Sequence, residues 1–193
     1  MGFGYDLACP TKPTDCSSQT VVIASSSSCI TAWDIRSSEI KRVFLAPYDG
    51  TFTPPIATAD METLLTWTDL IDNASVTPPF VRELYVSAGD MPVPDKNTFT
   101  IKNQVIVKSK NYTVNFDLLD VNATNYTLSR DFDNNKLAWV AYETDGGSLF
   151  GWMLMLIDSD IDLARGEDSN ELIKFVATMT EECKPPRYDS PFA

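Results

Sequence analysis

Short apolar stretches separated by turn residues dominate the chain from Ile40 onward. Apolar and polar residues alternate in Tyr112–Leu118 and again in Ile173–Met179, as they do in half-buried β-strands. Further strands are expected at Val43–Leu45, Pro79–Val86, Thr98–Lys108, Leu137–Thr144 and Ser148–Ile157. About seven short strands predict a mainly β fold, an antiparallel β-sandwich or barrel.

The residues between these strands predict two hairpins. Ser109–Asn111 is short enough to join Thr98–Lys108 to the strand that follows it. Asp145-Gly146-Gly147 is a turn sequence between the next two strands. Tyr126–Leu128 is expected to be a strand or a short turn.

One flanking α-helix is expected, from about Thr58 to Asp72. Thr58 can act as its N-cap, and Asp60 and Glu62 stand in the first turn, where the helix dipole favours anions. The apolar positions recur at helical spacing and comprise Met61, Leu64, Leu65, Thr68 and Ile71. This face should pack on the sheet.

The two ends of the chain differ from its middle. Residues 1–36 contain two prolines and clustered Ser and Thr, and residues 184–193 contain three prolines in ten positions. Neither segment can build a core of its own. We therefore expect an extended N-terminal arm over 1–36, a β-domain over 37–183 and an extended C-terminal tail over 184–193.

The composition argues against an enzyme. The chain has no histidine, which removes the usual nucleophile-base pairs and imidazole metal sites. It also lacks a glycine-rich phosphate loop, a dinucleotide fingerprint and a CxxC motif. We expect no catalytic residue and no cofactor.

An acid excess bears on possible partners. Fifteen Lys and Arg stand against 27 Asp and Glu, a formal net charge of −12. Such a surface repels phosphate backbones, so specific contact with nucleic acid is not expected. The acidity serves solubility alone or lets a polyanion pass without adhering.

The first residues bear on where the protein is made. MGFGYDLACPTKP has no basic stretch followed by an apolar one, and no run approaches the ~18 apolar residues of a membrane helix. We expect synthesis in the cytoplasm and no membrane contact. The cysteines Cys9, Cys16, Cys29 and Cys183 have no metal-like spacing and are expected as free thiols, with a disulfide or zinc cluster as the alternative.

Two groups of charged residues are candidate sites. Asp158, Asp160 and Asp162 recur with period two, which places three carboxylates on one face of a strand, as hard cations prefer. Leu163 and Ser169 stand where a calcium loop needs Gly and Glu, so a solvated edge is the alternative. Lys102, Lys108 and Lys110 either guard a strand edge or meet the acidic surface of a neighbouring subunit.

The order of elements resembles the tail tube and related virion proteins of tailed bacteriophages. The resemblance covers Ile40–Thr180 and is carried by KRVFLAP, TADMETLLTWTDLID, the strands of FTIKNQVIVKSKNYTVNFDLLDVNATNY, and above all LAWVAYETDGGSLFG. It implies a β-sandwich with a flanking helix that assembles into stacked rings around a conduit for DNA, with arms and loops between rings. A collar, completion or head-decorating protein on the same domain is a further possibility.

Two hypotheses from different classes follow. The first is a structural subunit of the virion that contacts itself, other virion proteins and passing DNA without binding it specifically. The second is a carbohydrate- or surface-binding β-sandwich, which would use exposed aromatic residues and the Asp158–Asp162 carboxylates. Trp67, Trp139 and Trp152 fall on apolar periodic elements and are expected in the core. Exposure of Trp139 and Trp152 separates the hypotheses.

Overall fold

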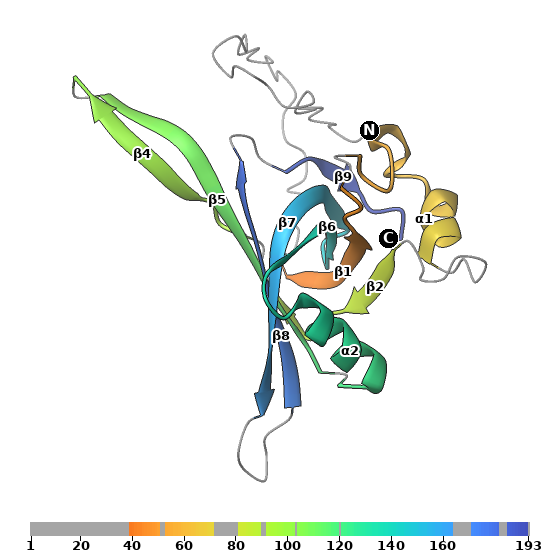
Figure 1. The fold of residues 1–193 in the computed structure, drawn as a ribbon. Helices are drawn as coiled ribbons and strands as arrows, with labels where there is room; N and C mark the ends of the chain where they lie inside the picture. Colours follow the sequence, from red (N-terminus) through yellow and green to blue (C-terminus); the bar gives the residue numbers. More distant parts are fainter. Residues whose placement is uncertain are drawn as a thin grey trace.

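The fold is a closed antiparallel β-barrel with a long hairpin projecting from it (Figure 1). The structure, a computed structural model, describes residues 39–50, 53–71, 81–89, 92–102, 104–119, 121–163, 171–181 and 185–192. The side chains of residues 162, 163 and 171 are outside the description. The expected N-terminal arm and all four cysteines also lie outside the described residues.

The barrel forms because one short segment pairs with both ends of the sheet. The strands follow the order β2 (Arg82–Tyr85), β1 (Ile40–Pro47), β6 (Lys136–Thr144), β7 (Ser148–Leu163), β8 (Glu171–Glu181), β5 (Gln104–Leu118) and β3 (Ala88–Gly89). β2 and β3 are separated by only two residues, and each pairs with a different end strand. The mainly β, antiparallel fold predicted from the sequence is confirmed.

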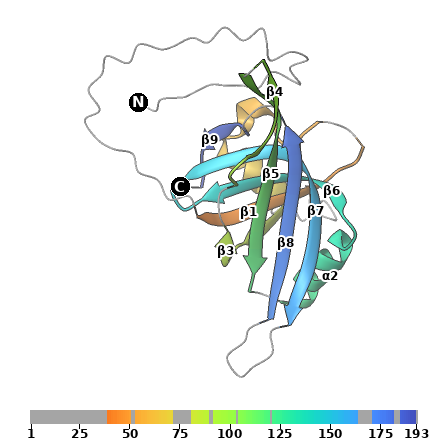
Figure 2. The same ribbon diagram turned by 90° about the vertical axis from the view of Figure 1, so that its left-hand side faces the viewer.

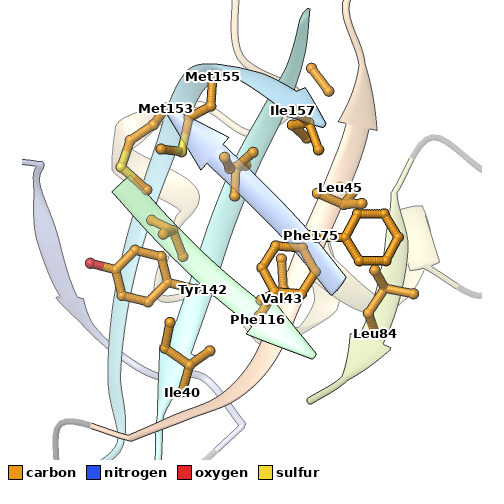
Figure 3. Packing of buried hydrophobic residues seen from close by; sticks show 14 of the residues in the cluster. Ile40, Val43, Leu45, Leu84, Phe116, Tyr142, Met153, Met155, Ile157 and Phe175 are labelled. Carbon is orange, nitrogen blue, oxygen red and sulfur yellow. The ribbon is translucent and has the colours of Figure 1, made fainter. Parts of the chain in front are cut away.

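The barrel interior holds the larger core. Alternate residues of β5 and β8 belong to this core, among them Val114 and Ala177. Phe116 and Phe175 point into it beside each other (Figure 3). The rings of Phe116 and Phe175 stack with centroids 5.0 Å apart. A Val or Phe side chain that is fully buried in this way stabilises the fold by roughly 1.5–3 kcal/mol.

A second core lies on the outer face of β1 and β6. Phe44, Ala141 and Trp152 pack there against Trp67 of helix α1 (Leu64–Ile71). β1 and β6 are therefore buried on both faces. The C-terminal strand β9 (Arg187–Asp189) pairs with β7 beside this core, and Phe192 stacks on Phe44 with centroids 5.3 Å apart.

The predicted helix begins later than expected and buries a different face. Thr58–Asp60 form a 3₁₀ turn (η2) without a side-chain cap, and the α-helix starts at Leu64. The Met61 side chain is buried. Its backbone carbonyl accepts a 2.8 Å hydrogen bond from the Trp67 indole, which connects the turn to the helix. Leu64 and Leu65, expected on the buried face, are exposed. The 3₁₀ turn changes the helical phase, so Trp67 faces the barrel instead.

A second helix, α2 (Ala123–Phe132), replaces the strand or turn expected at Tyr126–Leu128. The side chain of Asn122 caps it by accepting hydrogen bonds from the backbone of Thr124 and Asn125. Its Phe132 ring contacts Phe175 edge to face with centroids 6.3 Å apart. The helix thus packs against the interior core through Leu128 and Phe132.

No helix in the described part of the chain is long and apolar enough to cross a membrane.

The first hairpin turns at a different place than predicted. Strand β4 (Asp95–Ile101) pairs with β5, and Ile101 lies opposite Gln104, so the turn is at residues 102–103. Lys102 has a positive φ of 46°, a conformation that suits a two-residue hairpin turn. Ser109–Asn111, predicted as the turn, lie within the uninterrupted β5.

Candidate functional site

The β4–β5 hairpin, residues 95–110, projects from the barrel and is called the arm below (Figure 1). Beyond Lys110, which lies opposite Glu181 at the end of β8, the arm has no further strand beside it among the described residues. The arm is exposed at every described residue from Asp95 to Lys108. The arm therefore belongs to neither core.

Apolar side chains cover both faces of the arm. Directly opposite residues of two antiparallel strands share a face. Phe99 lies opposite Ile106, and Ile101 shares their face two residues along. Val105 and Val107 lie on the other face, opposite Thr100 and Thr98. These five apolar side chains are 39–67% exposed, which is unusual for a strand pair without a partner.

The base of the arm is held by a line of polar contacts. Asn97 Nδ2 donates to Ser109 Oγ at 3.0 Å, and Thr180 Oγ1 donates to Asn111 Oδ1 at 2.8 Å. These bonds connect β4, β5 and β8 where the arm leaves the barrel. The arm is therefore fixed in direction at its base.

The three lysines that the sequence offers as candidates for subunit contacts all belong to the arm. Lys102 stands at its turn, Lys108 at the bulge in β5, and Lys110 at its base. With Lys96 and Asp95, the arm carries four positive charges and one negative, a net charge of +3. The rest of the chain then carries −12 − 3 = −15. The arm is a basic, apolar projection from an acidic protein.

Asp158 and Asp160 lie on the outer face of β7, both exposed. Their strand neighbours on β8 are Val176 and Lys174. The backbone of Asp162 continues the strand, but its side chain is outside the description. Among the described residues, no three Asp, Glu, Cys or His side chains are grouped as metal ligands would be.

A buried charge network has no counterpart among the sequence predictions. Arg42 lies within β1, where its guanidinium donates to Glu143 at 2.5 Å and to Glu83 at 2.9 Å. Ser190 donates to the second oxygen of Glu143 at 2.6 Å, and the Phe192 ring covers the guanidinium at 4.5 Å. Burial lowers the pKa of Arg42, but hydrogen bonds and charge attraction from the two glutamates outweigh it and raise the pKa overall. The network fastens the C-terminal segment to the barrel.

The tryptophans predicted for the core are buried. Trp67 is fully enclosed, and Trp139 and Trp152 are 8% and 9% exposed. Trp67 and Trp152 stack on each other with centroids 5.3 Å apart. A sugar ring cannot stack on side chains covered in this way, so they do not support a carbohydrate-binding surface.

Comparison with known proteins assigns no family to the chain. No family model matches the chain, and no match is found among curated proteins or solved structures. The arm, identified by its geometry, is the candidate functional site.

Proposed function

We propose that the protein is a structural subunit of a phage virion, most simply a tail tube protein, whose copies associate into rings that stack as a conduit for DNA. The single observation that supports this most is the arm, which exposes apolar side chains on both faces without contributing to either core. Such a strand pair is a site for pairing or packing with another chain.

The charge distribution suits this role. A cationic surface would retain DNA with strong salt dependence, whereas the 15 excess negative charges outside the arm repel a phosphate backbone. DNA then passes without adhering. The subunit would be made in the host cytoplasm and would act in the virion, together with other virion proteins.

Point variants on the arm test the proposal. We expect the double variant Phe99→Ser and Ile106→Thr to raise the protein concentration needed for half-maximal assembly about tenfold or more. Each replacement removes roughly 1 kcal/mol of the hydrophobic free energy that the side chain contributes to a contact between two copies. Sedimentation velocity across a concentration series measures this. The thermal transition should stay unchanged, because neither residue belongs to a core.

Leu65→Ser is the matched control, since Leu65 is 73% exposed and lies on α1, away from the arm. It should leave assembly as it is. Assembly that is equally insensitive to the arm variants would contradict the proposal.

A further inference from the structure

We propose that the arm of one copy docks head to tail on the outer face of β5, β8 and β7 of a second copy. This inference rests on the proposed function, because it names the surface that receives the arm. The partner is another copy of this chain, and the two surfaces in contact are different ones.

The receiving surface is the part of the barrel that the described residues leave uncovered. β5, β8 and β7 lie side by side, and neither α1 nor α2 covers their outer face (Figure 2). The second core covers β1 and β6 instead, and α2 packs toward the barrel interior through Phe132. The exposed face can therefore be reached by another molecule.

The register defines which side chains make up this face. Three rows cross the strands, formed by Thr113, Thr178 and Leu156, by Asn115, Val176 and Asp158, and by Asp117, Lys174 and Asp160. Leu156 and Val176 are 37% and 41% exposed. Three carboxylates accompany one lysine. The face combines an exposed apolar centre with a net negative charge.

The arm is complementary to this face in both respects. Its apolar side chains can cover Leu156 and Val176, and its net charge of +3 matches the carboxylates. The two surfaces share strand β5 and lie toward its opposite ends, since β5 begins in the arm and reaches Asp117 near its other end. Each copy thus has a basic end and an acidic end.

This polarity favours contact between unlike ends. Two arms brought together would place like charges side by side, and so would two acidic faces. A contact between different surfaces repeats from copy to copy and closes into a ring or continues as a stack. The lysines then act in assembly and not merely as guards of a free strand edge.

A charge exchange between the two surfaces tests the inference. Variant A carries Lys102→Glu and Lys108→Glu on the arm, and variant B carries Asp158→Lys and Asp160→Lys on the receiving face. Both sets are exposed, so both variants should fold with an unchanged thermal transition. We expect each variant alone to need at least tenfold more protein to assemble, because its arm and its receiving face then carry charge of the same sign.

An equimolar mixture of A and B should assemble again. The acidic arm of A meets the basic face of B, and the basic arm of B meets the acidic face of A. The pair Lys41→Glu and Lys136→Glu controls for the charge change of A, and Asp60→Lys and Asp69→Lys control for that of B, at exposed sites off both surfaces. These controls should assemble as the unchanged protein does.

Three other results would overturn the inference in distinguishable ways. If A and B assemble like the unchanged protein, the docking surface is wrong while the proposed function stands. If each variant is impaired but the mixture does not recover, the two surfaces do not meet each other. If the unchanged protein remains a monomer, the proposed function fails and the docking fails with it.

Discussion

At Gly151 the strands β6 and β7 approach too closely for a side chain. A Cβ there would lie 2.6 Å from the Cβ and 2.7 Å from the Cα of Ala141, and the residue has a φ of +139°. Gly151, the last residue of LAWVAYETDGGSLFG, is thus required because the backbone of the neighbouring strand lies so close. Sequence patterns alone do not distinguish it from a turn glycine.

We expect Gly151→Ala to lower the free energy of unfolding by about 3 kcal/mol, from overpacking and from the strained backbone together. Gly50→Ala is the control, since Gly50 also has a positive φ but a Cβ added there would meet no atom within 4 Å. It should cost about 1 kcal/mol. Urea unfolding measures both, and equal costs would refute the close-approach argument.

The buried phenol of Tyr142 makes the stability of the fold depend on pH. Its side chain is buried in the interior core (Figure 3). The ring stacks on Phe150 with centroids 5.1 Å apart. Burial raises the pKa of this phenol well above its usual value, with a smaller contribution from Tyr112. The folded protein therefore keeps Tyr142 neutral at pH values where the unfolded chain ionises it.

The sign of the pH effect follows. A raised folded-state pKa contributes stability that is complete below the unfolded value of about 10 and is lost as the pH rises above it. Above pH 10 we expect Tyr142→Phe to lose stability less steeply than the unchanged protein, by up to about 1.4 kcal/mol per pH unit. Urea unfolding between about pH 9 and 11.5, on either side of that unfolded value, measures the two slopes. Identical slopes would contradict the assignment.

At the scale of elements, strict alternation of apolar and polar residues predicts strands correctly, whereas segments without a clear pattern are predicted less well. Tyr112–Leu118 and Ile173–Met179 alternate because one face packs inside the barrel while the other stays uncovered. The nearly continuous burial of β1 and β6 arises because both faces are covered. The sequence locates these strands but does not indicate which faces the second core covers.

The missed helix and the displaced turn have local causes. α2 has few apolar residues, and its signals are the Asn122 cap and the spacing of Leu128 and Phe132 by four residues. The sequence predicts the arm as one strand because β-forming residues stand on both sides of Lys102. Only the pairing of β4 with β5 identifies it as a hairpin. The sequence therefore marks the three lysines as candidates without showing that they share one projection.

At the scale of the whole molecule, the barrel has one long face left uncovered by the described residues and one projecting arm. The two differ in charge, although both belong to the sheet that contains β5. Composition yields the net charge of −12 but not its distribution, which depends on which strands lie side by side. Self-association through the arm is the central claim that connects this distribution to function.

The mass of the unchanged full chain in solution tests that claim most directly. Sedimentation equilibrium from low micromolar to about 100 μM protein, at moderate salt, covers the range expected for a contact of standard size. We predict a mass several times the 21.4 kDa of one chain, increasing with concentration and decreasing as salt is added. A constant mass of 21.4 kDa over the whole range would contradict the account.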